Sequence, residues 1–252
     1  MKTIDRGLKP TNGNRIIWRY MSLDKFIDLL TYKELHFTNA NHMTDQYEGV
    51  LPRKTVNAKM RSLESEGISS NQTIWDTIDE YTADWKRLKE LTALSCWSLS
   101  REESYALWKI YLGGSTAGVA LKTTVGALKR GILTSNKSKN IEINCSEVEY
   151  SDDVPENELN RYRLILRKYE FYKFEEEFRL FICEDENEDI DVSHPFVPPR
   201  ALRIKVDLPS LIDNIFFSPF IGEWFQIPFR MMVEKIYPGM ASKIVTSKVQ
   251  DR

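Results

Sequence analysis

The chain has 252 residues, enough for one large domain or two small ones with a sizeable buried core. Hydrophobic residues make up 42% and charged residues 29%, which excludes a disordered or fibrous chain. The 35 Lys and Arg nearly balance the 37 Asp and Glu, so the formal charge of −2 excludes wholesale histone-like charge binding. No apolar run approaches a membrane span, and the N-terminal segment lacks the apolar core of a signal peptide. We therefore expect a cytoplasmic protein with no membrane partner.

Cysteine and histidine are scarce in this sequence. The odd number of isolated cysteines favours a reducing compartment over a disulfide framework, and neither residue type shows zinc-ligand spacing. We expect no metal. The six residues are Cys96, Cys145, Cys183, His36, His42 and His194.

The first part of the chain alternates strand and helix patterns. A β-rich run over 15–20 predicts a strand, and apolar residues at helical spacing after Ser22 predict a short helix. Residues 34–38 predict a second strand, which leads into a loop through Asp45 and Glu48.

Two helical patterns follow, between about residues 53 and 90. Ile74, Ile78, Tyr81 and Trp85 keep the spacing of one amphipathic face, and Gly67 separates this pattern from the one before it. The pair predicts a helical hairpin inserted between strands. Such an insertion could cover a core or form a lid over a cleft, and the sequence does not decide between these roles.

The next elements are marked by capping residues. Residues 92–100 predict a strand, and the spacing of Ser100 and Glu103 predicts a helix over 101–112. Residues 117–122 predict a further strand, and residues near 141–150 look extended. A long polar helix from about residue 155, strands over 174–182, 200–207, 214–219 and 243–247, and a helix from residue 228 complete the pattern. Because strands and helices mix without strict alternation, we predict a single α+β domain over residues 1–252.

The strand predicted over 174–182 carries an unusual carboxylate pair. Glu175 and Glu177 would lie on one face with Arg179, roughly 7 Å apart from each other. Like charges held that close raise each other's pKa or require a cation. One interpretation is a solvated edge at which Arg179 neutralises a glutamate. The other is a paired-carboxylate site, in which one Glu orients a sugar hydroxyl and the other activates a nucleophile, as cleavage of an N-glycosidic bond requires.

Arg19 is the second unusual residue, because it lies between Trp18 and Tyr20 in an otherwise apolar strand. A charge there is costly unless it is paired. Arg19 is therefore either a structural residue bridged to Asp45 or Glu48, or a guanidinium that binds a phosphate or a ribose hydroxyl.

Three further side chains have two interpretations each. Trp108 and Tyr111 are neighbours on one helical face, where they could belong to the core or stack on a base. Ser98 ends a predicted strand and could begin the next turn or contact a ligand.

The signatures of P-loop, Rossmann, zincin and serine-hydrolase sites are all missing from the sequence, which excludes those enzyme classes.

Taken in order, these motifs resemble a large bacterial domain family that is classed as of unknown function. Its members carry Tyr-Arg/Lys-Tyr, Asn-Asp-Pro-Phe-Glu, Cys-Phe-Ser, Met-Trp-x-x-Tyr, Gly-Val, Glu-x-Glu-x-Arg and a strand that ends in Gly-Pro. The chain departs from this pattern at Thr44, Gln46, Leu107 and Ser218. The corresponding segments here are 18–23, 44–49, 96–98, 107–111, 118–119, 175–179 and 218–219.

The strand–helix–strand opening is also similar to that of DarT-type toxins, which attach ADP-ribose to nucleic acid. This resemblance implies an ADP-ribosyltransferase-like fold with NAD as substrate and no metal. It implies that Arg19 holds NAD and that Glu177 and Glu175 are catalytic. The residues that it implies for NAD contact are Arg19, Tyr20, Asp45, Ser98, Trp108 and Tyr111.

The resemblance also implies partners. RNA or DNA would be the acceptor, with a protein acceptor as the alternative. The basic residues between Lys122 and Lys139, and the polar helix that carries Arg161, Arg163, Arg167 and Lys168, could form a nucleic-acid surface or simply a solvated face and an exposed helix. An NAD-consuming enzyme would harm its host, which implies a toxin or anti-phage role and a restraining partner such as an antitoxin. Two alternatives stay open: a non-enzymatic module that binds a nucleotide or a partner, and a nuclease with carboxylates around Mg²⁺. An accessible Glu177 would favour catalysis, and a fully paired, inaccessible Glu177 would favour the module.

Overall fold

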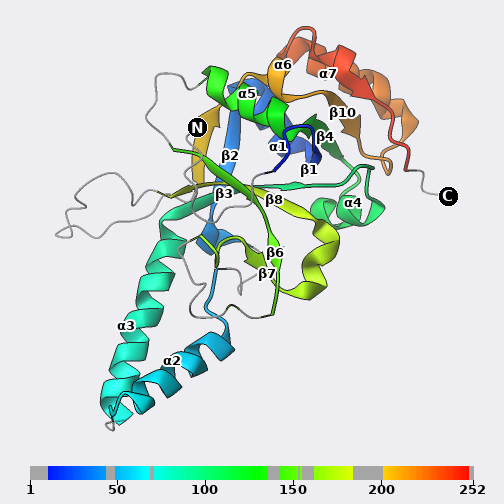
Figure 1. The fold of residues 1–252 in the computed structure, drawn as a ribbon. Helices are drawn as coiled ribbons and strands as arrows, with labels where there is room; N and C mark the ends of the chain where they lie inside the picture. The colour runs from blue at the N-terminus through cyan, green and yellow to red at the C-terminus, as the bar shows by residue number, and fades with distance from the viewer. Residues whose placement is uncertain are drawn as a thin grey trace.

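A nine-stranded mixed sheet organises the part of the chain that the computed structural model describes, residues 11–43, 49–68, 71–135, 142–152, 154, 162–183 and 201–249 (Figure 1). Helices and strands are intermixed around it, which confirms the predicted α+β class. The sheet strands are β1 (Ile16–Ser22), β2 (Glu34–Asn39), β3 (Thr92–Ser98), β4 (Gly118–Thr124), β5 (Asn144–Glu147), β8 (Glu177–Cys183), β9 (Ala201–Lys205), β10 (Asn214–Phe217) and β11 (Ile244–Val245).

The sheet forks at β3. Its order is β11-β10-β4-β1-β3-β2-β9, with β8 on the other edge of β3 and β5 beyond β8. On the forked edge, Ser98 of β3 pairs with Trp18 of β1, whereas Leu94 pairs with Thr38 of β2. Between these two points the backbone pairings of the described strands on this edge skip residues 95–97 of β3. Strands β1 and β2 therefore diverge from a shared neighbour.

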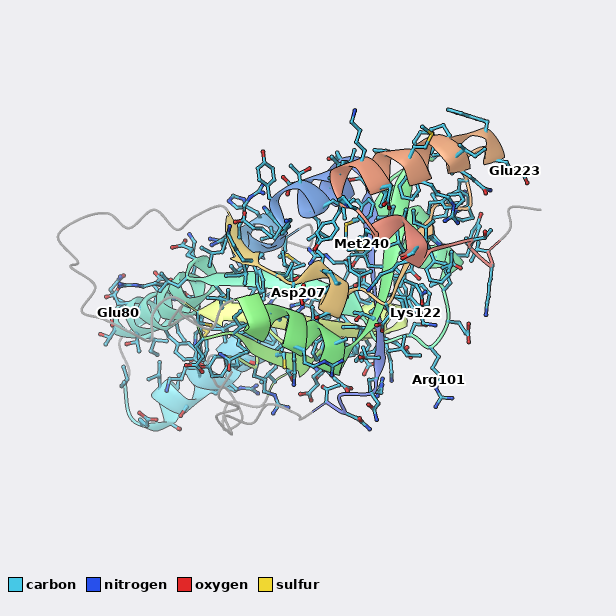
Figure 2. All side chains as sticks on the ribbon, turned by 90° about the horizontal axis from the view of Figure 1, so that it is seen from above. Glu80, Arg101, Lys122, Asp207, Glu223 and Met240 are labelled. Carbon is cyan, nitrogen blue, oxygen red and sulfur yellow. The ribbon has the colours of Figure 1, made fainter. Side chains whose placement is uncertain are left out.

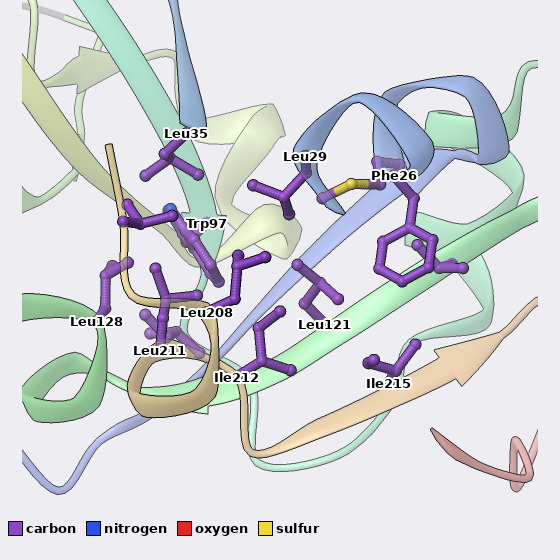
Figure 3. Close-up of a cluster of buried hydrophobic side chains, with 14 of the residues drawn as sticks. Phe26, Leu29, Leu35, Trp97, Leu121, Leu128, Leu208, Leu211, Ile212 and Ile215 are labelled. Atoms are coloured by element: carbon purple, nitrogen blue, oxygen red, sulfur yellow. The ribbon is translucent and has the colours of Figure 1, made fainter. Parts of the chain in front are cut away.

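One face of the sheet packs against helices to form the main core (Figure 3). Alternate residues of the strands point to this face, as the period of two requires. Leu35, Trp97, Leu121 and Ile215 contribute from four strands. The covering helices are α1 (Leu23–Tyr32), α5 (Val125–Ser135), α6 (Leu208–Leu211) and α7 (Gln226–Ile236).

The opposite face is covered by two separate clusters. Helix α4 (Tyr105–Leu112) packs Leu107 and Trp108 against β1, β4 and β10. Ile165 and Leu166 pack against β3 and β8 at the other end. Because these clusters are separate, the β1–β3–β8 region between them is left for polar side chains.

The predicted helical hairpin is present as α2 (Arg53–Ser65) and α3 (Asn71–Glu90), and it extends away from the sheet (Figure 1). Figure 2 shows Glu80 of α3 at one end of the molecule and Glu223 at the other. A small apolar cluster around Leu63, Ile74 and Ile78 holds the two helices together. None of the helices in the described residues combines the length and the apolar character needed to cross a bilayer.

Two predicted helices differ from the structure. The fourth helix begins at Tyr105 rather than 101, because the Ser104 hydroxyl accepts the Leu107 N–H at 3.3 Å, while Ser100 donates to a backbone carbonyl. Arg167 and Lys168 form β7 (Arg167–Lys168), which pairs in parallel with β6 (Glu149–Tyr150), and both side chains are buried rather than exposed on a helix. The predicted start of that helix near residue 155, with Arg161, lies outside the described residues.

Gly118 offers a direct test of the packing between β1 and β4. A Cβ added at Gly118 would lie 2.7 Å from the Met21 backbone oxygen, which cannot move without disturbing β1. We expect Gly118→Ala to lower the free energy of unfolding by about 1–3 kcal/mol, measured by urea denaturation. Gly13→Ala is the control, because a Cβ there meets other atoms only at 3.7 Å. Equal stability of the two variants would contradict this packing.

Candidate active site at the fork of the sheet

A cavity of about 800 Å³ lies at the fork between β1 and β2. Its wall includes residues of β1, β2, β3 and β8 together with α1, α4, β7, β9 and the 3₁₀ helix η3 (Glu170–Glu175). The chain therefore brings to one place most of the residues that the sequence singled out. Those that line the cavity are Arg19, Tyr20, Ser98, Tyr111, Glu175 and Glu177.

Among the described residues that the sequence singled out, Trp108 is not in this wall. Trp108 is fully buried behind Tyr20, with the two rings edge to face at 5.1 Å, and its indole N–H donates to Glu103 at 2.7 Å. Trp108 therefore supports the wall from behind and does not line the cavity. Asp45, with Glu48, lies outside the described residues.

Glu177 begins β8 directly opposite Ser98 of β3, which in turn pairs with Trp18 of β1. Side chains of such laterally paired residues share one face of the sheet. The carboxylate of Glu177 accepts two hydrogen bonds from Arg179, at 2.8 Å from Nε and 2.9 Å from a terminal nitrogen. Arg179 is fully buried, and Glu177 is only 3% exposed although it contributes to the cavity wall. The predicted pairing of Arg179 with a glutamate is thus present.

Lys168 joins the two glutamates. Its ammonium nitrogen lies 2.7 Å from Glu175 Oε2 and 3.1 Å from Glu177 Oε2, and 4.8 Å from the centre of the Tyr172 ring. Lys168 lines the cavity, although its sequence context predicted an exposed helix and therefore no role in the site. The sequence did carry one signal, because two carboxylates held close together require a cation. This requirement does not by itself identify Lys168 as that cation.

Glu175 reaches this cluster by a route that differs from the prediction. It ends η3, and Glu176 adopts a left-handed backbone with φ of 43° before β8 begins. Glu175 and Glu177 are therefore not alternate residues of one strand, as the sequence pattern predicted. They meet because both carboxylates bind the ammonium group of Lys168.

The charges around Glu177 decide its protonation state. Burial alone would raise the pKa of Glu177. The positive charge and hydrogen bonds of Arg179, the positive charge of Lys168 and a hydrogen bond from Cys96 instead lower it to about 2. Glu177 is therefore a carboxylate at neutral pH. It can accept a hydrogen bond or stabilise positive charge, but it cannot act there as a general acid.

Arg19 crosses the fork. It donates to the Ser95 hydroxyl at 2.5 Å and to the His36 carbonyl oxygen at 3.2 Å, and its guanidinium carbon lies 5.6 Å from the centre of the Trp97 ring. Burial lowers the pKa of Arg19, but a guanidinium remains protonated at neutral pH. Within the described residues no carboxylate forms an ion pair with Arg19. Its five N–H donors exceed these two neutral acceptors, so an anionic ligand would find donors here.

Aromatic and hydroxyl groups complete the wall. The Tyr20 and Tyr111 rings stack at 6.2 Å with an angle of 22°, and Tyr111 is 45% exposed. Tyr20 is held from outside the cavity, because its hydroxyl accepts the Ser104 N–H at 2.8 Å. The Ser98 hydroxyl is buried beside Glu177 and has no hydrogen-bond partner in the described part of the chain. An unpaired buried hydroxyl is costly, which favours a ligand that uses it.

Comparison with known proteins adds no constraint: no protein-family model and no curated protein matches the chain. The described residues contain no group of three or more His, Cys, Asp and Glu side chains placed to hold a metal ion. The function therefore has to be inferred from a cavity that combines an arginine, stacked tyrosines, a buried serine and an ionised glutamate.

The lowered pKa of Glu177 predicts a specific pH dependence of stability. The folded protein holds this carboxylate ionised down to a pH of about 2, whereas its ordinary pKa is 4.5. Its stabilising contribution is therefore complete above pH 4.5 and is lost as the pH falls toward 2. We expect Glu177→Gln to lower the free energy of unfolding at pH 7 by about 3–5 kcal/mol, because Arg179 and Lys168 stay buried. The difference in unfolding free energy between Glu177→Gln and the wild type should become smaller at pH 2 to 3.

Urea denaturation from pH 7 to pH 2 measures this effect. Glu80→Gln, a substitution on the exposed surface of α3, is the control and should leave the pH profile unchanged. A constant difference between Glu177→Gln and the wild type over the whole range would contradict the assigned pKa.

Proposed function

We propose that the protein is an NAD-dependent ADP-ribosyltransferase with an ADP-ribosyltransferase-like fold, and that its acceptor is nucleic acid. The observation that carries the proposal is that Arg19, Ser98 and Glu177, from three strands, all line the wall of one cavity. The order of these residues along the chain also agrees with the resemblance drawn from the sequence. A cavity of about 800 Å³ falls in the size range of small-molecule sites.

Substrate binding follows from the charges and rings in the wall. Arg19 offers unused N–H donors to the diphosphate of NAD, which accepts such bonds well. The exposed ring of Tyr111, backed by Tyr20, offers a stacking surface for a planar ring of the dinucleotide. Ser98 supplies a hydroxyl next to Glu177, where the ribose hydroxyls would lie.

The chemical step uses the ionised state of Glu177. Its carboxylate accepts a hydrogen bond from the ribose 2′-hydroxyl and stabilises positive charge on the ribose as the C1′–N bond breaks and its electron pair leaves with nicotinamide. An oxygen or nitrogen of the acceptor then forms the new bond to C1′. Glu175 receives the proton of the acceptor, and Lys168 keeps Glu175 within reach of this centre.

A second candidate function is supported by the burial of Glu177. Both of its oxygens are bound by Arg179, one of them also by Lys168, and only 3% of the side chain is exposed. The two carboxylates and two cations cancel in charge, which weakens the stabilisation of a positive transition state. On this interpretation the cavity binds a nucleotide or a partner without chemistry, and the ion cluster is a scaffold.

The proposed activity implies restraint in the cell. Because a free NAD-consuming enzyme would harm its host, we propose a role as a toxin or anti-phage effector, held in check by a partner such as an antitoxin.

Transfer of label from NAD that carries a labelled ADP-ribose group tests the proposal. With a bacterial lysate as the acceptor pool, we expect labelled products that RNase or DNase removes and protease does not. Glu177→Gln should lower kcat about 100-fold or more with a modest change in KM for NAD. Glu176→Gln is the matched control, because this neighbouring glutamate is exposed and does not line the cavity.

Two readouts separate folding from function. Circular dichroism of each variant reports its folded fraction, and Ser98→Ala provides a second variant that leaves the ion cluster intact. If the wild type binds NAD but transfers no label, the binding module replaces the transferase. Label that resists nucleases but not protease would instead identify a protein acceptor.

A further inference from the structure

Glu103 lies just before helix α4 and accepts hydrogen bonds from two separate parts of the chain. The Trp108 indole N–H donates to its Oε1 at 2.7 Å, and the Ser247 hydroxyl donates to the same oxygen. The Lys248 backbone N–H donates to Oε2 at 2.9 Å. One carboxylate therefore ties α4 to residues 246–249, which follow β11 and reach the helix (Figure 1).

The buried end of this link is Trp108, whose side chain has no exposed surface. Without Glu103 its N–H would lose its acceptor and could not reach water, and an unpaired buried donor is costly. Val245 and Val249 pack against the same apolar cluster as Trp108. The carboxylate therefore joins two segments that share one apolar contact surface, and it supplies the polar contact that this surface lacks.

The position of α4 decides where the aromatic wall of the cavity lies. Helix α4 has eight residues, too few for a helix to be stable without contacts to the rest of the protein. Tyr111 belongs to its last turn, lines the cavity and stacks on Tyr20 at 6.2 Å. The Tyr20 hydroxyl in turn accepts the N–H of Ser104, the residue next to Glu103. A shift of α4 would therefore move Tyr111 relative to Tyr20 and change the stacking surface.

We propose that Glu103 is a positioning residue for ligand binding. Anchored to residues 246–249, it holds α4, and with α4 the Tyr20–Tyr111 stacking surface, in place. Glu103 does not line the cavity, so it acts through Trp108 and α4 and not on the ligand itself. That this surface receives a ring of NAD rests on the proposed function, whereas the anchoring of α4 does not.

Amide hydrogen exchange in the absence of NAD tests the anchoring. Glu103→Met keeps the length of the side chain but removes both acceptor oxygens, and it should speed the exchange of the α4 amides about 10-fold. Glu103→Gln keeps one acceptor oxygen, so its effect should lie between that of Glu103→Met and the wild type. The amides of α7, on the other face of the sheet, should exchange as in the wild type, which separates a local change from a loss of global stability.

Steady-state kinetics tests the consequence for the ligand. Glu103→Met should raise KM for NAD about 10-fold and leave kcat within about twofold of the wild type, because it disturbs a binding surface and not the reacting groups. Ser247→Ala removes one donor of the link and should raise KM about 2- to 3-fold. Glu102→Gln is the matched control and should change neither parameter, because this neighbouring side chain is 78% exposed and its carboxylate lies 4.0 Å from the exposed Lys248 ammonium. If NAD binds without transfer, its dissociation constant takes the place of KM.

Four results would overturn the proposal. They are wild-type exchange of α4 in Glu103→Met, equally fast exchange in Glu102→Gln, faster exchange in Glu103→Met without a change in KM, or a fall in kcat at an unchanged KM. The last would give Glu103 a role in the chemical step. If α4 loosens in Glu103→Met while the wild type neither binds NAD nor transfers ADP-ribose, the anchor stands and the proposed function fails. If the wild type transfers ADP-ribose and Glu103→Met changes neither exchange nor KM, the reverse holds.

Discussion

The ion cluster of Glu177, Arg179, Lys168 and Glu175 is the interaction on which the site depends. It ties the first residue of β8 to its neighbour in the same strand, to the short strand β7 and to the end of η3. Two positive and two negative charges are removed from water together, which is tolerable only because each finds a close partner. This cluster fixes the positions of three parts relative to one another: the start of β8, the turn before it and the cavity wall.

The same cluster sets the limit on chemistry at this site. Arg179 is fully buried and has no contact with the cavity, so its effect on Glu177 is permanent. Lys168 lines the cavity, so it is the cation of this cluster that an incoming group would meet. The strength of the field that Glu177 exerts on a ligand therefore depends on where the Lys168 ammonium lies. This is the physical difference between the transferase and the binding module.

The sequence predicted regular elements well and their junctions poorly. A β-rich run identified β1, and the alternation of residues 174–182 identified β8, one face of which packs into the main core. The start of α4 was wrong because Ser100 and Ser104 are both suitable caps and only the hydrogen bonds distinguish them. Glu175 was predicted on the strand with Glu177, because nothing in the sequence of residues 175–177 indicates the left-handed backbone of Glu176. A non-glycine residue with positive φ is uncommon enough to escape pattern analysis.

The site residues also divide into those that the local sequence pattern identifies and those that depend on tertiary contacts. Arg19 and Glu177 could be found from the sequence, since a charge within an apolar strand pattern stands out locally. Lys168 could not, because its importance arises from contacts with residues seven and nine positions further along, across a turn. Trp108 was assigned to both core and ligand contact, and its burial behind Tyr20 depends on the packing of α4, which no local pattern specifies.

The fork in the sheet has a mechanical consequence. The β1–β4–β10–β11 half and the β2–β9 half are joined within the described sheet only through β3. Their relative angle is therefore set by the twist of β3, by the Arg19 hydrogen bonds that span the gap, and by helix α1, which contacts β1, β2 and β4. A small rotation about β3 would change the width of the cavity without breaking a ladder in either half. A ligand that fills the gap would therefore hold the two halves of the sheet at one angle.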